Sequence, residues 1–290
     1  MAGNSGRPVS PEDYHQFCAP GVTYRTDWVK VNPQVVLKVI IFEPPAEKEG
    51  LDMVFIPGWI SQMTSWQIVL REMTTRYRIY YVETREKISS RVIGRVRYDV
   101  HSLGGDIAAV INHYRLKRDA YFLFGSSLGG TTILDCAVDL DEKPACLILV
   151  GPNAVIRIPK SAMPVIYLFY PGFYWLLKPA IKWYLKNFRL DVQSDMGQYH
   201  KYCAALDAAD PWKLKKAAIP LSKYQVWDLL PEIKLPVLIF SASKDVMHEP
   251  DNLKKMSEIL PNATLIDMET NQGSHSTEMV REIYQYLKIL

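Results

Sequence analysis

The 290-residue sequence lacks a strong excess of either charge. Lys and Arg together number 34 and Asp and Glu number 31, so the formal net charge is only +3. Domains that bind nucleic acid usually have a strong and clustered excess of positive charge. The near balance of charge therefore argues against a nucleic-acid partner.

Cysteine is scarce, and its spacing fits neither a disulfide framework nor a zinc site. The four cysteines, Cys18, Cys136, Cys146 and Cys203, are scattered and form no C-x-x-C pair. Cys136 and Cys146 fall in apolar stretches, where a free thiol behaves as a small hydrophobic side chain. A reducing, cytoplasmic compartment is therefore expected.

The sequence also lacks a long uninterrupted apolar run. The longest, Met163 to Leu177, is shorter than the roughly 20 residues of a membrane span and contains Pro164 and Pro171. Residues 1–8 have no apolar core and do not resemble a signal peptide. We therefore expect no stable membrane insertion.

Strand-like and helix-like segments alternate over most of the chain, with short connections. This order is typical of an α/β fold in which helices cover both faces of a mostly parallel sheet. The first two strands, joined at Asn32-Pro33-Gln34, read as a hairpin. The expected strands are 22–31, 35–42, 53–56, 79–82, 121–124, 146–150, 237–240 and 264–266, and the expected helices are 65–77, 103–114, 128–138, 252–260 and 277–290.

The alternation lapses between residues 152 and 231. This segment is rich in aromatic residues and lysine, is interrupted by prolines, and keeps helical spacing over 181–188 and 199–206. Its aromatic content is too high for a solvated linker, so we interpret it as a helical cap. The expected organisation is an N-terminal arm over 1–21, a core over 22–151 and 232–290, and the cap over 152–231.

The most informative motif is Gly125-Ser126-Ser127-Leu128-Gly129, a G-x-S-x-G that follows an expected strand and opens an expected helix. In this context the turn, a nucleophile elbow, is so tight that only small neighbours fit and the central serine is strained. The elbow exposes Ser127 at the carboxyl end of the sheet, beside the N-terminus of the next helix. We therefore predict Ser127 as a nucleophile; the alternative is an inert Gly/Ser-rich turn.

A serine hydroxyl needs a base to accept its proton and an acid to orient that base. Among six histidines, His275 lies in a polar loop between the last strand and the last helix, where it can reach over Ser127. Asp245 follows the strand 237–240 and is the expected acid, and Asp106, within an expected helix, is its competitor. The order Ser127, Asp245, His275 is the chain order of a triad in this kind of fold.

An oxyanion hole requires two backbone N–H donors close to the nucleophile. Leu128, directly after Ser127, is expected to supply one. The other should come from the loop after the strand 53–56, with Trp59 as the first choice and Ile60 as the second. The alternative reading of that loop is a simple turn in which Trp59 fills the core.

These motifs resemble those of the α/β-hydrolase superfamily, in particular its capped esterase, lipase and carbon–carbon hydrolase branch. The resemblance implies an eight-stranded, mostly parallel sheet, a cap inserted after the sixth strand, and no metal or organic cofactor. Two segments depart from the pattern of many relatives. Pro57-Gly58 replaces a His-Gly pair, and Glu83 to Ser90 replaces a Gly-rich turn.

The aromatic residues of the expected cap would form apolar surface above Ser127. We expect Ile60 and the cap residues Tyr167, Tyr170, Phe173 and Trp175 to bind substrate, although packing of the cap against the core explains most of its aromatics equally well. Three lysines, Lys178, Lys182 and Lys186, recur at four-residue spacing. They indicate a solvated helix face or a transient contact with anionic lipid.

The combined expectation is a serine hydrolase that cleaves carboxylic esters with a hydrophobic acyl or alcohol group through an acyl-enzyme. Its partner is then a small hydrophobic ester. A thioesterase, a carbon–carbon bond hydrolase or an acyltransferase could use the same three residues, so these remain alternatives. A ligand receptor built on this fold is the non-enzymatic alternative.

Overall fold

The computed structural model describes residues 13–45, 50–158, 163–190, 192, 196–245 and 250–289. Residues 1–12 of the expected N-terminal arm and the candidate base His248 lie outside these ranges. The described remainder of the arm is held against the core, because Tyr14, Phe17 and Cys18 are buried in a cluster with strand and helix residues. Within the described ranges, no helix combines the length and apolarity needed to cross a membrane.

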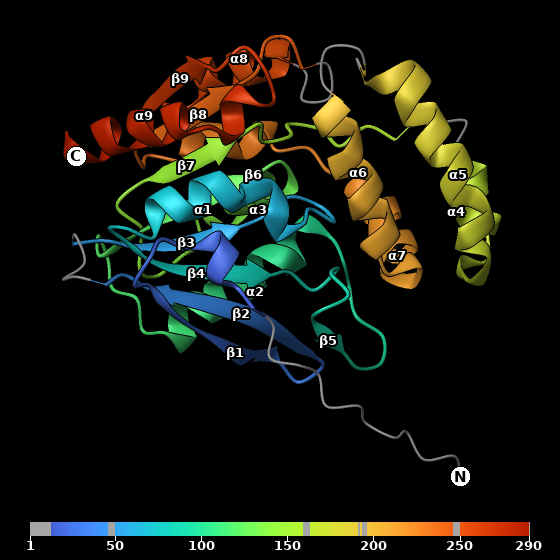
Figure 1. The fold of residues 1–290 in the computed structure, drawn as a ribbon, viewed down its shortest axis with the longest axis horizontal. Coiled ribbons are helices and arrows are strands. Elements are labelled where there is room, and N and C mark those ends of the chain that lie inside the picture. Colours follow the sequence, from blue (N-terminus) through green and yellow to red (C-terminus); the bar gives the residue numbers. More distant parts are fainter. Residues whose placement is uncertain are drawn as a thin grey trace.

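One nine-stranded sheet forms the centre of the fold (Figure 1). The strands run in the order β1-β2-β4-β3-β6-β7-β8-β9, and β5 pairs with β2 beside this path. β1, β2 and β4 are antiparallel neighbours, and the pairs from β4 through β3 to β9 are parallel. The strands are β1 (Thr23–Asn32), β2 (Val35–Glu43), β3 (Asp52–Ile56), β4 (Arg78–Glu83), β5 (Arg91–Val92), β6 (Tyr121–Ser126), β7 (Leu147–Val150), β8 (Val237–Ser241) and β9 (Ala263–Asp267). The expected mostly parallel sheet of eight strands is confirmed, with the two-residue β5 as an addition.

Helices cover both faces of the sheet. Side chains alternate between faces along a strand, so Val54 and Ile56 of β3 pack on one side while Met53 and Phe55 pack on the other. Both sets are fully buried, which explains why β3 is apolar at every position from Met53 to Ile56. The first side is covered by α2 (Val100–His113), α3 (Leu128–Cys136) and α8 (Pro250–Ile259), and the second by α1 (Gln67–Met73) and α9 (Thr277–Lys288).

Between β7 and β8 the described residues form four α-helices, called here the inserted helices. They are α4 (Met163–Leu168), α5 (Tyr174–Tyr184), α6 (Met196–Ala208) and α7 (Pro211–Leu221). A 3-10 turn, η4 (Pro171–Phe173), precedes α5, and a π-helical turn, η5 (Leu185–Arg189), follows it. α6 and α7 lie nearer the sheet than α4 and α5, which form the outer layer (Figure 1).

α7 was not expected from the sequence, where Pro211 reads as an interruption. In the structure Pro211 is the first residue of α7, and the Asp210 side chain accepts hydrogen bonds from the N–H groups of Trp212 and Lys213. Proline is compatible with a first helical position, because that N–H has no intrahelical acceptor. The proline therefore begins a helix here.

Candidate active site

Ser127 occupies a strained turn between β6 and α3. Its backbone has φ 49° and ψ −120°, a conformation that costs a non-glycine residue about 1–3 kcal/mol. Its N–H donates a hydrogen bond to the carbonyl oxygen of Val150 at 2.9 Å. The neighbouring strand β7 thus helps to hold the turn that was expected from the G-x-S-x-G motif.

The two motif glycines are required by close backbone approaches. A Cβ atom on Gly129 would lie 2.1 Å from the carbonyl oxygen of Ile56, and one on Gly125 would lie 2.8 Å from the Cα of Gly130. Backbone atoms cannot move aside as the end of a side chain can. The strand–turn–helix geometry around Ser127 therefore depends on glycine at both positions.

Asn153 contacts the hydroxyl of Ser127. Its side-chain Nδ2 donates a hydrogen bond to Ser127 Oγ at 2.8 Å. The hydroxyl of Thr131 fixes Asn153, since it accepts from the Asn153 N–H and donates to the Asn153 carbonyl, both at 2.9 Å. Sequence reasoning missed Asn153, because a single asparagine after a strand forms no recognisable motif.

Ser127 and His275 line the same cavity, which has a volume of about 310 Å³. Of the described histidines, His275 is the one that reaches this cavity. Trp59 and Ile60 also line it, on the side of the β3–α1 connection. The structure therefore brings together four of the residues selected from the sequence, contributed by segments that follow three different strands.

His275 is held in one orientation by two neighbours. Its Nδ1 lies 2.8 Å from the carbonyl oxygen of Asn271, an atom that can only accept, so the proton of the neutral ring is on Nδ1. The imidazole also stacks on Trp66, with 4.3 Å between ring centroids and 37° between planes. This tautomer leaves Nε2 as an acceptor, the state that a general base requires.

Asp245 is buried just past the end of β8. Its Oδ2 accepts hydrogen bonds from Asn271 Nδ2 at 3.1 Å and from Gln198 Nε2 of α6 at 3.2 Å. Asn271 therefore contacts both residues, Asp245 through its side chain and His275 through its carbonyl. Gln198 links the inserted helices to the same carboxylate.

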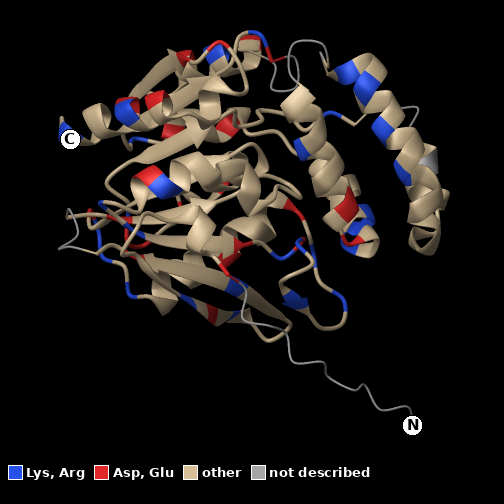
Figure 2. Ribbon diagram, in the orientation of Figure 1, with Lys and Arg blue, Asp and Glu red and all other residues tan. Residues whose placement is uncertain are grey.

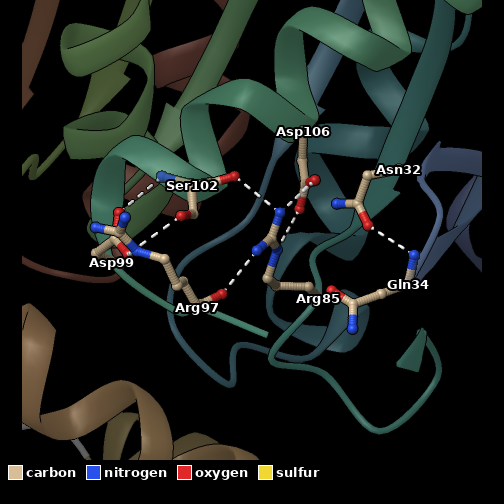
Figure 3. A network of polar contacts seen from close by, with 7 residues as sticks. All are labelled: Asn32, Gln34, Arg85, Arg97, Asp99, Ser102 and Asp106. Atoms are coloured by element: carbon tan, nitrogen blue, oxygen red, sulfur yellow. Dashed lines mark hydrogen bonds and ion pairs between the residues drawn. The ribbon is translucent and has the colours of Figure 1, made fainter. Parts of the chain in front are cut away.

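Asp106, the competing acid, is engaged elsewhere. It accepts two hydrogen bonds from the guanidinium of Arg85, both at 2.6 Å, and both side chains are buried. Arg85 also donates to the carbonyl oxygens of Arg97 and Ser102 (Figure 3). Asp106 thus pairs with a cation that ties the segment after β4 to α2, and it is not among the described residues of the cavity.

The loop after β3 lies directly beside Ser127. A Cβ on Gly58 would come within 3.2 Å of the Ser127 Cβ. Ile60 has φ 52°, and the N–H of Ser61 bonds the Gly58 carbonyl at 3.0 Å, so the loop turns sharply. On the other side of Ser127, Leu128 is the first residue of α3, where a backbone N–H has no intrahelical acceptor.

Four of the expected substrate-binding residues lie away from the cavity. Tyr167, Tyr170, Phe173 and Trp175 are between 51% and 65% exposed and are not among the described residues that line it. Residues that no sequence pattern marked contribute from the 152–231 segment instead. These are Asn153, Ala154, Val155, Ile156, Arg157, Ile158, Arg189, Gln198, Lys201, Tyr202 and Ala205.

Most of the segment that replaces the Gly-rich turn of many relatives is buried, although Ile88 is exposed, and the segment is firmly anchored. Lys213 of α7 donates to the carbonyl oxygens of Lys87 and Ser90, at 2.5 and 2.7 Å, and Lys87 donates to the carbonyl of Ser61. Glu86 is 3% exposed, and burial raises the pKa of its carboxyl group. The segment thus connects α7 to the loop that holds Trp59 and Ile60.

Comparison with known proteins finds esterases and a lactonase among the proteins that are similar to this chain. A pimeloyl-[acyl-carrier protein] methyl ester esterase from Aliivibrio salmonicida is 21% identical over 83% of this chain and 94% of that protein. The enol-lactonase of Burkholderia xenovorans is similar in structure, with a TM-score of 0.72, 15% identity and coverage of 90% of this chain and 98% of that chain. A thermophilic esterase from Thermogutta terrifontis has a TM-score of 0.69, 20% identity and coverage of 91% and 98%.

The sequence model of the family described as serine aminopeptidase, S33 (Hydrolase_4), matches residues 95–277, which is more than half of the chain. This stretch contains Ser127, Asp245 and His275. Together with the fold, the match confirms the resemblance to the α/β-hydrolases. The chain belongs to this hydrolase family and has the α/β-hydrolase fold.

Proposed function

We propose that this protein is a serine esterase that hydrolyses carboxylic esters with a hydrophobic acyl or alcohol group. The observation that supports it most is the shared cavity of Ser127 and His275, with the His275 proton held on Nδ1 by Asn271. The relatives that are named esterases point in the same direction.

In the proposed reaction, Ser127 Oγ attacks the ester carbonyl carbon and His275 Nε2 takes the hydroxyl proton. The buried Asp245 carboxylate stabilises the imidazolium that forms. The oxyanion is held by the N–H groups of Leu128 and Trp59, with Ile60 N–H as the alternative to Trp59. The protonated His275 then donates to the leaving alkoxide, and a water molecule activated by the same base releases the acyl group.

The inserted helices are proposed to act as a cap over this reaction. α6 contributes Gln198, Lys201 and Tyr202 to the cavity wall, and η5 contributes Arg189. A volume of about 310 Å³ is small for a ligand pocket, which suits a compact ester or one end of a longer one.

The family description names an aminopeptidase, and the charge of the cavity favours an ester instead. An aminopeptidase must bind the α-ammonium of its substrate, for which a carboxylate is the natural partner. The described lining residues include three cations, Arg157, Arg189 and Lys201, and no Asp or Glu. The described part of the cavity wall therefore offers no carboxylate to a free amino terminus.

The test is hydrolysis of p-nitrophenyl esters of increasing acyl length, with methyl esters of the same acids and amino-acid p-nitroanilides beside them. We expect turnover of esters with a chain-length optimum, little turnover of the anilides, and loss of activity in Ser127→Ala. Activity should also fall in acid, as His275 becomes protonated.

The alternatives give different results in the same assay. Turnover of thioesters in preference to oxygen esters would indicate a thioesterase, and ester formation with an added alcohol would indicate an acyltransferase. No ester turnover would contradict the proposal and favour carbon–carbon hydrolysis. Tight binding with very slow hydrolysis would instead indicate a ligand receptor.

A further inference from the structure

The outermost helix of the structure turns an apolar side to solvent. None of the residues of α5 is buried. Its most exposed large side chains, with those of η5, recur at one-, four- and eight-residue spacings and therefore share one face of the helix. They are Trp175, Leu176, Trp183, Tyr184 and Phe188, called here the outer stripe, and their exposed fractions are between 41% and 65%.

The charged side of α5 faces inward. Lys178 and Lys182 both form ion pairs with Asp207 of α6, at 3.0 and 2.8 Å. The hydroxyl of Tyr174 donates to the carbonyl oxygen of Leu206, also on α6, at 3.0 Å. A surface helix normally places its apolar side against the core, so the orientation of α5 is the reverse of the usual one. These contacts with α6 hold α5 in the orientation in which the outer stripe faces solvent.

The apolar exposure continues onto the neighbouring α4 and η4. Leu168 is 86% exposed, and Tyr167 and Phe173 are also exposed. α4 is anchored to α7 through Lys215, whose Nζ donates to the carbonyl oxygens of Tyr167 and Phe169 at 2.9 and 2.7 Å. The exposed apolar side chains are thus presented by helices that are anchored from behind.

The charge of this region has one sign. Residues 163–190 contain four basic residues, Lys178, Lys182, Lys186 and Arg189, and no Asp or Glu. Figure 2 shows basic positions and no acidic position on the ribbon of α4 and α5. Lys178 and Lys182 are paired with Asp207, so Lys186 is the exposed basic residue of α5 and η5. A second copy of the chain docked face to face would bring two Lys186 side chains together, which disfavours a symmetric dimer through this face. An anionic surface has the complementary charge.

We propose that the outer stripe docks the protein on the surface of a membrane that contains anionic phospholipid. Tryptophan and tyrosine favour the interfacial layer of a bilayer, and lysine and arginine beside them attract anionic head groups. Arg189 lies at the end of η5 and also lines the cavity of Ser127. A docked protein therefore holds the cavity close to the bilayer surface, where hydrophobic esters accumulate.

The test is co-sedimentation of the full chain with vesicles of phosphatidylcholine, with and without phosphatidylglycerol. We expect binding that requires phosphatidylglycerol and weakens at high salt. Trp175→Ser with Trp183→Ser should weaken the partition at least about tenfold, because two large apolar side chains are removed from the interface. Lys186→Glu should weaken it as well.

Two controls make the outcome specific. Ile68→Ser with Ile93→Ser removes apolar side chains that are 52% and 70% exposed outside this region, and it should leave the partition unchanged. Ser127→Ala should bind vesicles like the original chain, which separates docking from the proposed esterase activity. Circular dichroism checks that each variant is folded.

Four results would overturn the proposal. One is the absence of binding to either kind of vesicle, and another is equal binding of the tryptophan double variant and the original chain. The third is a stable dimer in solution that Trp175→Ser with Trp183→Ser converts to a monomer, since the stripe would then be an interface between two copies. Equal binding to vesicles without phosphatidylglycerol would contradict the requirement for anionic lipid.

Discussion

Asn153 donates a hydrogen bond to the hydroxyl oxygen of Ser127, with 2.8 Å between Nδ2 and Oγ. An amide donor leaves the hydroxyl proton of Ser127 free to point toward another acceptor. The contact therefore orients the hydroxyl group without competing with a base for its proton. Thr131 holds Asn153 in place through the Asn153 backbone.

Asn153→Ala should lower kcat by about two- to tenfold, since one hydrogen bond is worth about 0.5–1.5 kcal/mol. Asn153→Asp should lower it further, because a carboxylate would accept the Ser127 proton and draw the hydroxyl away from His275. Steady-state kinetics on the preferred ester measure both variants, with the exposed Asn112→Ala as the control. An Asn153→Asp variant as active as the original would contradict this role.

Replacing Trp66 should distinguish its support of the His275 imidazole, which affects kcat, from its packing in the core, which affects stability. Trp66 is 1% exposed, stacks on His275 and contacts Phe124 edge-on at 5.5 Å. Trp66→Ala should destabilise the fold by about 3–5 kcal/mol and lower kcat, because the imidazole loses its support. Trp66→Phe should retain most of the stability and most of the kcat.

Urea unfolding and ester kinetics at a temperature where each variant is folded measure these effects. Phe122→Ala is the matched control, because it removes a fully buried ring that packs edge-on against Tyr77. It should lose stability but keep kcat. A Trp66→Ala variant with unchanged kcat would show that the stack has no part in catalysis.

The effects of replacing Arg85 and Asp106 on the free energy of unfolding should be strongly non-additive. Removing one partner leaves a buried charge without its partner, so Arg85→Met or Asp106→Leu should each lower the free energy of unfolding by about 3–5 kcal/mol. The double variant should lose clearly less than the sum of the two, since no unpaired charge remains. Additive losses in urea unfolding would mean that the two side chains do not depend on each other.

Glu86 should make stability depend on pH. Burial raises the pKa of its carboxyl group, so the folded state favours the protonated form. Its contribution to stability is complete below the ordinary glutamate pKa and is lost as the pH rises through the raised value. Glu86→Gln should therefore have a higher Tm than the original chain at neutral pH.

At about pH 4, the Tm of Glu86→Gln should no longer exceed that of the original chain, because Glu86 is then protonated in the folded and the unfolded state. Thermal unfolding at the two pH values measures the difference. Glu258→Gln, an exposed position on α8, is the control and should change Tm little at either pH. A lower Tm for Glu86→Gln at neutral pH would indicate that the ionised carboxylate is stabilising.

Local patterns were enough to predict the core of the fold and the position of Ser127. The alternation of apolar strands with helices predicts a parallel sheet, and G-x-S-x-G predicts the turn that Ser127 occupies. His275 was selected because parallel strands end at one edge of a sheet, and it lines the same cavity as Ser127. The partners of these residues were not predictable, since the contacts of Asn153 and Asn271 depend on segments that are distant in the sequence.

The inserted helices show the limit of sequence patterns most clearly. Tyr167, Tyr170, Phe173 and Trp175 were expected to bind substrate, and most aromatic residues of the segment could equally pack it against the core. α5 instead turns Lys178 and Lys182 toward Asp207, and Trp175, Trp183 and Tyr184 outward. Helical spacing predicts two faces, but it does not predict which of them contacts the rest of the protein.

The most direct test of the central claim is labelling with a fluorophosphonate, which reacts covalently with an activated serine hydroxyl. Intact mass and peptide mapping should show one adduct per chain, on the peptide that contains Ser127, and none in Ser127→Ala. His275→Ala should slow the labelling strongly, because the serine loses its base. An adduct on another serine, or equal labelling of Ser127→Ala, would contradict Ser127 as the nucleophile.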